Sequence, residues 1–439
     1  MYAQVAVENV NCTFDKDYDY SIPQQLEGKA LVGCRVAVPF GIGNRKRIGI
    51  ITRLTDSTQG KRIKSISAVL DEAPLLSNEM MSLARWISEQ TFCTYYEAVK
   101  AMLPAGINHK IIRSFCAVPG VDESVLASLD SDEKQVYDYL LSRSGYVKPE
   151  NFLKTLGFDV SSDIPERLLK VGLLAANDDA VRNIGDNNIR MVRLCEGSDD
   201  VSMTKKQSEV VNVLKDVGSV SVKELCYFTG YTPSVISALE KKGVVECFER
   251  EELRSFVSRY AVRSAYDSGE IHLTDEQQKA YDGLLEDYKS GTGKTALLYG
   301  VTGSGKTSVY LKLIDAVLAD NKTVIVMVPE ISLTPQTLSV FHSRYNDGVA
   351  VFHSALSAGE RADEWKRVKN GDAKIVIGTR SAVFAPLENI GLIIIDEEQE
   401  HTYKSEQTPR YNAKSVARYR AAWHKGLTLL ASATPSIES

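Results

Sequence analysis

The tripeptide Gly-Lys-Thr, the centre of many phosphate-binding loops, occurs twice in close succession, at 293–295 and at 305–307. Such a loop requires the pattern G-x-x-x-x-G-K-[ST], with a strand before it and a helix after it. The second copy completes the pattern from Gly300 to Thr307, after the apolar run ALLY and before the amphipathic run SVYLKLIDAVLA. The first copy has Tyr288 where the leading glycine belongs, within a polar run. We therefore predict that the second copy binds phosphate and that the first resembles the motif by chance.

The residue types of this loop suit a nucleotide bound with magnesium. Glycines let backbone N–H groups turn toward phosphate oxygens, aided by the N-terminus of the following helix. Lys306 is expected to neutralise the β and γ phosphates, and the Thr307 hydroxyl to ligate Mg²⁺. The predicted nucleotide-binding residues of the loop are Gly300, Thr302, Gly303, Ser304, Gly305, Lys306 and Thr307.

A carboxylate for the metal is expected at the end of a neighbouring buried strand. The run GLIIIDEEQE places Asp396 and Glu397 directly after apolar residues. Asp396 would hold Mg²⁺ and Glu397 would polarise the attacking water. Surface acids after a strand are the alternative, which the apolar run disfavours. Lys306, Thr307, Asp396 and Glu397 are the predicted catalytic residues, with Thr307 and Asp396 as metal ligands.

Short apolar runs separated by helical segments must position these residues. They lie at 296–300, 323–328, 349–352, 374–378, 392–396 and 427–432. Continuous apolar strands that alternate with helices indicate a parallel sheet covered on both faces, so an α/β lobe is expected here.

The first part of the chain reads differently. Residues 1–110 contain β-like runs such as GCRVAVPFG, followed by a helical stretch at 77–101 with Ser77 as its cap. Residues 111–265 contain a degenerate repeat, and each copy reads as helix, turn, helix, loop, helix and a short strand. This order is typical of a winged helix built twice. A helical spacer is the alternative.

DNA reading by the second copy is weakly supported. Its third helix carries Thr232, Ser234 and Ser237, with no Arg or Lys before Lys241. This composition favours spacing and protein contact over base reading.

Length and composition restrict the class of protein that the chain can belong to. A length of 439 residues allows about three domains, and a hydrophobic content of 44% is enough for each to bury a core. No apolar run approaches the ~18 residues of a membrane span, and MYAQVAVENV is not a signal peptide. The seven cysteines form no C-x-x-C pair, so neither zinc ligands nor disulfides are expected. We expect a cytoplasmic, nucleoid-associated protein.

The motifs, and their order along the chain, resemble those of the primosomal replication-restart helicases of superfamily 2. The segments that carry the resemblance are GVTGSGKT, VPEISLTPQ, GTRSAVFAP, LIIIDEEQ, PRYNAKSVA and SATPSIES, with YDYSIP and GCRVAVPFG near the N-terminus. The resemblance implies a multidomain α/β fold: a β-rich 3′ DNA-end-binding domain (1–110), a winged-helix-like tandem region (111–265) and a RecA-like first helicase lobe (266–439). It also implies ATP, Mg²⁺ and 3′→5′ DNA unwinding.

The resemblance assigns further roles in the lobe. Gln277 falls on the position that reads adenine, Ser432 and Thr434 on the segment that couples ATP state to strand movement, and Thr379 and Arg380 on a contact with the DNA backbone.

The loop after the acidic pair resembles the aromatic-rich loop of the family. Tyr403 and Tyr411 would stack on unpaired bases, while Lys404 and Arg410 would meet phosphates. An ordinary surface loop is the alternative. Gln399 stands where the family usually has His, and its amide is expected to keep a coupling role; Asn412 replaces another usual His.

At the N-terminus, Tyr18, Asp19, Gly33 and Lys64 fall on the pocket that captures a 3′ DNA end. Tyr18 replaces the usual Phe and keeps a stacking face. The segment 44–64 carries Arg45, Lys46, Arg47, Arg53, Lys61, Arg62 and Lys64 against the single acid Asp56. A charge run is usually a solvated face, but here it would attract phosphate in a chain of net charge −5.

The family continues with a second lobe, an arginine finger and paired zinc-binding cysteines. The chain is therefore expected to be truncated, to bind ATP weakly and to hydrolyse it poorly, with zinc only in the missing part. Expected partners are branched forks, single-stranded DNA, primosome and helicase-loader proteins and single-strand-binding protein, met by a monomer away from membranes. A fork-recognition scaffold and another superfamily 2 translocase are the alternatives; GCRVAVPFG and the aromatic loop disfavour the latter.

Overall fold

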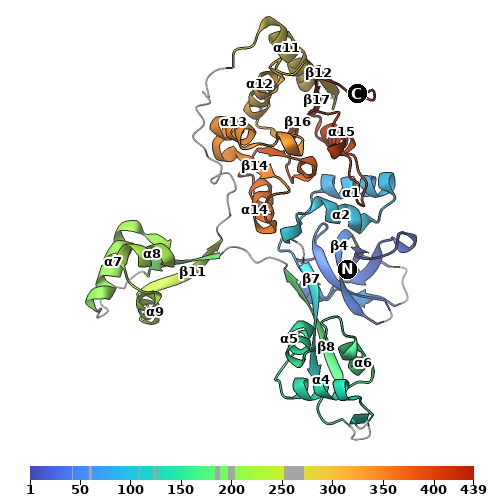
Figure 1. The fold of residues 1–439 in the computed structure, drawn as a ribbon, viewed down its shortest axis with the longest axis vertical. Coiled ribbons are helices and arrows are strands. Elements are labelled where there is room, and N and C mark those ends of the chain that lie inside the picture. The colour runs from blue at the N-terminus through green and yellow to red at the C-terminus, as the bar shows by residue number, and fades with distance from the viewer. Residues whose placement is uncertain are drawn as a thin grey trace. The chain divides into compact units, whose positions relative to one another are not determined.

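The structure, a computed structural model, describes residues 1–41, 43–58, 62–107, 109–121, 125–126, 128–182, 188–195, 203–251 and 271–439. Its contacts form two units, Met1–Asn183 with Tyr260–Ser439, and Ile184–Arg259 (Figure 1). Lys61 and the predicted boundary between residues 265 and 266 lie outside the described residues. None of the helices within these ranges is both long and apolar enough to cross a bilayer.

A six-stranded sheet in the order β5-β2-β1-β4-β3-β6 forms the N-terminal part of the larger unit. Its strands are β1 (Tyr2–Val7), β2 (Tyr18–Ser21), β3 (Arg35–Phe40), β4 (Arg45–Thr55), β5 (Lys64–Ser65) and β6 (Ala68–Val69). Inward residues such as Val5, Val36 and Ile51 are fully buried and share one core. The predicted β-rich N-terminal domain is confirmed.

Two helices, α1 (Asn78–Thr91) and α2 (Tyr95–Met102), follow this sheet. The Ser77 side chain accepts from Met80 N, as the sequence predicted, and Thr94 forms a capping box with Glu97. Their apolar side chains belong to the same hydrophobic core as strands of the C-terminal sheet. Figure 1 shows α1 beside a helix of the C-terminal part, α15 (Ala413–His424).

An antiparallel pair of strands, with three helices between them in the chain, follows α2. Strand β7 (His109–Ala117) pairs antiparallel with β8 (Leu174–Arg182), and the helices are α4 (Ser131–Leu141), α5 (Pro149–Leu156) and α6 (Ile164–Lys170). Phe115, Val136, Phe152 and Leu168 fill their core. The helix order agrees with the first predicted repeat copy.

The C-terminal part contains a parallel sheet in the order β12-β17-β16-β13-β15-β14. The strands are β12 (Thr295–Tyr299), β13 (Thr323–Met327), β14 (Val349–Phe352), β15 (Ile375–Gly378), β16 (Ile390–Asp396) and β17 (Leu427–Ser432). The helices between them are α12 (Lys306–Ala319), α13 (Pro335–Tyr345), α14 (Ala358–Lys369) and α15, and α11 (Asp275–Lys289) precedes them. All six predicted strands are present, and the RecA-like α/β lobe is confirmed.

The smaller unit contains a second set of three helices. These are α7 (Lys205–Val217), α8 (Val222–Thr229) and α9 (Pro233–Lys241). Its sheet has the order β10-β9-β11, formed by β9 (Asn188–Leu194), β10 (Ser219–Ser221) and β11 (Val245–Glu251). Leu214, Leu225 and Leu239 are fully buried in its core. Each repeat copy thus has a core of its own, and the first copy belongs to the larger unit.

Candidate nucleotide site

The loop Gly300–Thr307 and the acidic pair lie at the same edge of the parallel sheet. Strand β12 ends at Tyr299 and β16 ends at Asp396, and β17 pairs in parallel with both. The carboxyl ends of parallel strands meet at one edge, so loop and carboxylates face the same space. The backbone N–H of Gly300 also donates to the Ser432 carbonyl at the end of β17, over 3.2 Å.

Two glycines of the loop adopt backbone angles that other residues rarely reach. Gly303 has φ 81° and Gly305 has φ 78°, both in the left-handed region. A Cβ at Gly305 would in addition overlap the side-chain amide of Gln277. The sequence pattern therefore reflects both backbone conformation and close packing.

Lys306 begins α12, and its ammonium group turns back into the loop. Its Nζ donates to the carbonyl of Gly300 over 2.7 Å and to that of Val301 over 3.4 Å. The positive charge is thus held within the turn that would receive a phosphate, at the N-terminus of a helix. Thr307 follows on the same helical turn and is exposed.

Asp396 lies directly beside the second carboxylate of the pair, Glu397. Burial, and next the charge of Glu397, raises its pKa, and Lys306 only partly opposes the rise. Tyr310 of α12 is buried and interacts with both Thr307 and Asp396; burial, and next the charge of Asp396, raises the pKa of this phenol. The hydroxyl and carboxylate oxygens of Thr307 and Asp396 are hard ligands that suit Mg²⁺. A divalent cation there would balance the buried charge, so the residues present fit this metal.

Gln277 connects the loop to the helix before it. Its Oε1 accepts from the Thr274 backbone N–H over 3.0 Å, which completes the cap of α11. Its Nε2 donates to the Ser304 carbonyl over 2.9 Å. Gln277 therefore lies against the loop, and adenine reading by this residue stays a prediction.

A chain of hydrogen bonds links the acidic pair to the last strand. Gln399 Nε2 donates to Glu397 Oε2 over 2.8 Å, and Ser432 Oγ donates to Gln399 Oε1 over 2.6 Å. The Thr434 backbone N–H donates to Ser432 Oγ over 2.9 Å. The three residues predicted to couple ATP state to movement are thus connected to Glu397.

Glu397 itself has φ 47°, a conformation that non-glycine residues rarely adopt. Its backbone N–H donates to Asp396 Oδ1 over 3.1 Å. The turn therefore holds the two carboxylates in a fixed relation.

The aromatic loop differs from its prediction. Tyr403 is 1% exposed, and its hydroxyl donates to the backbone carbonyls of Asp396 (2.6 Å) and Met327 (3.2 Å). Tyr411 is 7% exposed and packs edge-on against Phe384. Rings buried in the core cannot stack on bases, so the prediction that Tyr403 and Tyr411 stack on DNA is wrong. Tyr403 instead supports the ends of β16 and β13, and Tyr411 packs beneath the loop. Lys404 and Arg410 are exposed.

Arg380 holds this loop by its backbone. Its guanidinium donates to the carbonyls of Lys404 (2.7 Å) and Thr402 (3.3 Å) and lies 5.9 Å from the ring centroid of Tyr411. A groove of about 540 Å³ runs here, lined in part by Thr379, Arg380 and Lys404. We refer to it as the Thr379 groove. Three of the residues predicted to contact the DNA backbone therefore share one surface.

Three residues of the predicted 3′-end pocket, Tyr18, Asp19 and Lys64, lie on β2 and β5 of the N-terminal sheet, and Gly33 lies in the turn before β3. Tyr18 packs edge-on against Phe40 at 5.0 Å, and Lys64 Nζ donates to the Gly41 carbonyl over 2.6 Å. Asp19 Oδ2 accepts from Thr58 over 2.5 Å. The structure thus brings Tyr18 and Lys64 to the adjacent residues Phe40 and Gly41.

Gly33 lies farther across the sheet. Tyr18 pairs with Val5, Val5 pairs with Ile51, and the Gly33 backbone N–H donates to the Ile51 carbonyl over 2.9 Å. Its φ is 86°, and a Cβ there would lie 2.7 Å from the Leu76 carbonyl. Gly33 is thus required for backbone conformation and packing, and its pocket role stays a prediction.

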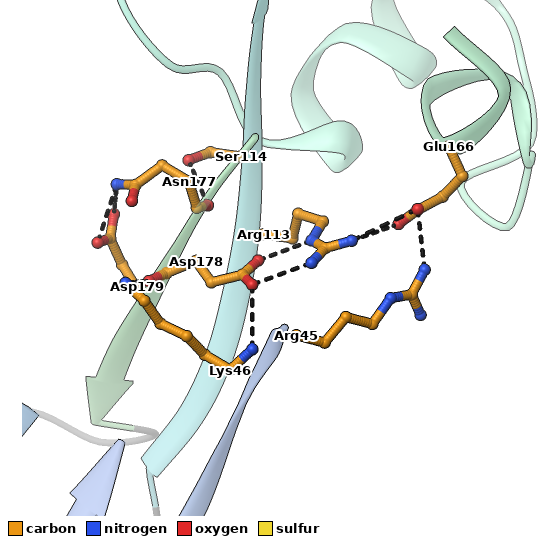
Figure 2. A network of polar contacts seen from close by, with 8 residues as sticks. All are labelled: Arg45, Lys46, Arg113, Ser114, Glu166, Asn177, Asp178 and Asp179. Atoms are coloured by element: carbon orange, nitrogen blue, oxygen red, sulfur yellow. Dashed lines mark hydrogen bonds and ion pairs between the residues drawn. The ribbon is translucent and has the colours of Figure 1, made fainter. Parts of the chain in front are cut away.

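Part of the basic segment is engaged within the protein. Figure 2 shows Arg45 donating to Glu166 (2.8 Å), while the backbone N–H of Lys46 donates to Asp178 Oδ2 (3.3 Å). Arg113 joins both acids, at 3.1 Å from Glu166 and 2.7 Å from Asp178. Burial alone would raise the pKa of Asp178, but Arg113 and Lys46 lower it. The Lys46 ammonium group donates to the backbone carbonyl of Asp178 over 2.8 Å. Arg45 and Lys46 are therefore engaged within the protein, contrary to the expectation of a free phosphate-attracting run, whereas Arg53 and Arg62 are exposed.

The first Gly-Lys-Thr lies at the other end of β12. Lys294 precedes the strand, and its Nζ forms an ion pair with Asp287 over 2.6 Å. Gly293 packs against the backbone of Ala422 in α15. This copy is therefore separated by a whole strand from the acidic pair.

The sequence matches two family models and several known proteins along most of its length. Residues 4–104 match the family model of the 3'DNA-binding domain (3'BD), and residues 274–439 match that of the DEAD/DEAH box helicase. The chain is 36% identical to the replication restart protein PriA of Bacillus subtilis (strain 168), across 100% of this chain and 54% of that protein. It is 33% identical to the replication restart protein PriA of Synechocystis sp., across 96% and 50%.

The chain belongs to the PriA family of replication restart proteins. It spans about half the length of the curated relatives it matches. Among solved structures it is similar to the Pyrococcus furiosus Hef helicase domain, with 19% identity, coverage of 37% of this chain and 32% of that chain, and a TM-score of 0.28. That likeness is too partial to add to the assignment.

Two residues that stand where the sequence resemblance led us to expect His have defined contacts here. Gln399 completes the chain of bonds from Glu397 to Ser432. Asn412 caps α15, because its Oδ1 accepts from the Lys414 backbone N–H over 2.9 Å. Both side chains thus supply a hydrogen-bond acceptor at their positions.

Sequence reasoning missed Glu398, the third acid of the run. Its side chain is fully buried, and it accepts from Lys414 Nζ (2.7 Å) and from the backbone N–H of Ser436 (2.6 Å). Burial alone would raise the pKa of Glu398, but these contacts lower it. Glu398 therefore fixes the segment after Thr434. The sequence did contain a signal for this role: metal binding and water activation require only Asp396 and Glu397, so a third acid directly after them points to a structural role.

Proposed function

We propose that this chain is the ATP-binding and 3′-end-sensing half of an ATP-driven 3′→5′ DNA helicase of replication restart. One observation carries the proposal: the Gly300–Thr307 loop and Asp396 share a sheet edge, and hydrogen bonds connect Glu397 to Ser432 and Thr434. The same chain carries the 3'DNA-binding domain match.

At the nucleotide site, Lys306 would bind the terminal phosphates and Gln277 would face the adenine. Thr307 and Asp396 would hold Mg²⁺, which neutralises charge on the β and γ oxygens. Glu397 would orient the attacking water and accept its proton, since its carboxylate is the one held by Gln399. Burial of Asp396 keeps the interaction with a cation strong.

The DNA contacts follow two surfaces. Thr379, Arg380 and Lys404 would contact the strand backbone along the Thr379 groove, and the exposed Arg410 would add a phosphate contact. Tyr18 and Lys64 would stack on and neutralise a terminal nucleotide, and Asp19 would accept its free 3′ hydroxyl.

The whole protein would recognise stalled or branched forks by the leading-strand 3′ end and promote loading of the replicative helicase. Its partners would be primosome and loader proteins and single-strand-binding protein, met as a monomer in the cytoplasm. The chain alone would bind ATP and DNA but hydrolyse ATP slowly, because a second lobe must close over the γ-phosphate. Zinc would belong to the rest of the protein.

Fork binding by the intact chain tests this function. We expect tighter binding to a fork with a free leading-strand 3′ hydroxyl than to one with a 3′ phosphate, with and without a non-hydrolysable ATP analogue. Asp19→Asn should remove the difference, whereas the matched change at the exposed acid, Asp56→Asn, should not. Equal binding of both forks by the unmodified chain would refute 3′-end sensing.

A scaffold without an essential motor is the second candidate. It is favoured by Tyr227 and Phe228 on α8, which are 85% and 71% exposed and suit a protein contact. Lys306→Ala discriminates between the two in the full-length protein: a motor loses unwinding while fork binding persists, whereas a scaffold keeps restart activity.

A further inference from the structure

Two phenylalanine side chains of the N-terminal part are largely in solvent. Phe92 is 88% exposed and Phe14 is 63% exposed. Both lie within residues 4–104, the part of the chain that matches the 3'DNA-binding domain. Neither ring is stabilised by burial in the core, so packing does not account for the choice of phenylalanine at these positions.

The backbone of Phe92 makes its exposure more informative. Phe92 is the C-terminal cap of α1, with φ 52° in the left-handed region. Glycine or asparagine normally occupies such a cap, because a bulky side chain is strained there. Neither local conformation nor burial therefore favours phenylalanine at this position. A strained residue whose ring points to solvent indicates a binding task at the surface.

The two phenylalanines belong to neighbouring segments of the fold. Cys12 Sγ donates to the Phe92 carbonyl over 3.7 Å, and the Tyr95 backbone N–H donates to Asp15 Oδ2 over 2.9 Å. The short 3-10 helix Cys12–Phe14 therefore lies against the turn between α1 and α2. We call the exposed rings of Phe14 and Phe92, together with Lys16, the Phe92 platform.

The Phe92 platform is continuous with the predicted 3′-end pocket. The Tyr18 hydroxyl donates to the Phe14 carbonyl over 2.9 Å. Lys16 lies between these two residues in the chain, and its ammonium group is 5.4 Å from the centroid of the Tyr18 ring. A strand whose end is held at Tyr18 would therefore pass beside Lys16 and Phe14.

The charges beside the rings suit a DNA strand. Lys16 and Arg47 lie over the rings of Tyr18 and Phe40, and neither forms an ion pair with any residue that the structure describes.

The nearby acids are Asp15 and Asp17. Asp15 accepts from the Tyr95 backbone, and Asp17 accepts from Thr52 over 2.9 Å and from Arg85 over 3.5 Å. These carboxylates are thus engaged within the protein, while two cations stay available for phosphate. Aromatic rings beside such cations are what unpaired bases and their phosphates require.

We propose that the Phe92 platform binds the unpaired DNA strand just before its 3′ end. Bases would stack on Phe14 and Phe92 while Lys16 meets a phosphate, and the terminal nucleotide would stay in the pocket at Tyr18. Stacking needs only the flat face of a base, so this contact is independent of sequence. The proposal rests on the proposed function, because the pocket must first hold the end.

Binding of dithymidylate and tetrathymidylate, each with a free 3′ hydroxyl, to the intact chain tests the platform. The dinucleotide reports on the pocket, and the ratio of the two affinities reports on the nucleotides before it. Phe14→Ala combined with Phe92→Ala should reduce this ratio by about fivefold or more, the effect of losing one stacked base. The affinity for the dinucleotide should be kept.

The matched control is Phe228→Ala, because Phe228 is 71% exposed on α8, outside the matched domain. It should leave both affinities unchanged. An unchanged ratio in the double variant would overturn the platform and favour a protein contact for the exposed rings. If the unmodified chain bound neither oligonucleotide, the 3′-end pocket itself would be refuted, and the platform that rests on it as well.

Phe92→Asn gives a second test, in which stability and binding change in opposite directions. Asparagine suits a φ of 52° better than phenylalanine does, so the urea midpoint should rise. Binding of tetrathymidylate should weaken at the same time, because the ring is lost. A more stable variant that binds tetrathymidylate like the unmodified chain would overturn the role of Phe92 in DNA binding.

Discussion

Arg420 and Glu79 form a buried, bidentate ion pair between α15 and α1. Arg420 Nε lies 2.7 Å from Glu79 Oε1, and its second terminal nitrogen lies 2.9 Å from Oε2. The guanidinium also donates to the carbonyls of Val383, Ala385 and Leu387. All donors of the arginine are thus used, and the segment after Arg380 is tied to the N-terminal helices.

Arg420→Met should lower the free energy of unfolding of the larger unit by about 3–5 kcal/mol, because it removes the bidentate partner of the buried Glu79 carboxylate and leaves only His424 beside it. Urea denaturation followed by tryptophan fluorescence measures this, since Trp86, Trp365 and Trp423 lie on α1, α14 and α15. The matched variant Arg418→Met, at an exposed position of α15, should change it by no more than about 0.5 kcal/mol. Equal losses in both variants would contradict the role of the ion pair.

The same pair predicts a loss of stability in acid. Burial alone would raise the pKa of Glu79, but Arg420 and His424 lower it from 4.5 to about 2. A carboxyl with a lowered folded pKa stabilises above its unfolded pKa, and this contribution disappears as pH falls from 4.5 toward about 2. The urea midpoint of the unmodified chain should fall over that window. Glu79→Gln should show a weaker dependence there, and an identical slope would exclude Glu79 as the titrating group.

Lys306→Ala should weaken binding of a fluorescent ATP analogue by about tenfold to a hundredfold, the effect of losing a charged hydrogen bond to phosphate. The matched variant Lys294→Ala changes the other Gly-Lys-Thr, which pairs with Asp287 outside the site. It should bind the analogue like the unmodified chain. A larger effect at Lys294 would reverse the assignment of the two copies.

Gln399→Ala should break the hydrogen-bond chain between Glu397 and Ser432 without removing a phosphate or DNA contact. We expect the affinity for single-stranded DNA to change by about fivefold or more when a non-hydrolysable ATP analogue binds the unmodified chain. The change should be largely absent in Gln399→Ala, while the affinity for each ligand alone is kept. Gln399→His should retain it. Full coupling in the alanine variant would show that the signal takes another route.

Glu166→Gln should make DNA binding stronger and more sensitive to salt. It removes the charge that pairs with Arg45 and frees this cation for phosphate. The slope of log affinity against log salt should steepen by about 0.9, the value for one further phosphate contact. Glu150→Gln, at an exposed acid on α5, serves as the control. Identical slopes for the two variants would show that Arg45 does not reach DNA.

The sheet and the loop were predictable because their signals are local. Each buried parallel strand reads as a continuous apolar run, as at 392–396, and the spacing of Gly300, Gly305 and Lys306 fixes the phosphate loop. The acidic pair follows its strand directly. These features require no knowledge of distant contacts.

The residues that sequence reasoning misplaced depend on distant partners. Tyr403 is an aromatic in a polar loop, and nothing local indicates that its hydroxyl meets the Met327 carbonyl. The charge run at Arg45 and Lys46 likewise does not reveal Glu166 and Asp178, more than a hundred residues away in the chain. Where a side chain points, and which group it contacts, depend on how distant segments of the chain pack together.

The core shared by α1, α2 and the helicase sheet has a mechanical consequence. Residues of the N-terminal sheet, of α1 and α2 and of the helicase sheet pack into this single core, which ties the N-terminal domain to the lobe. A movement of the lobe during ATP turnover would therefore be transmitted to the N-terminal sheet. A DNA 3′ end bound to that sheet would be displaced together with the lobe.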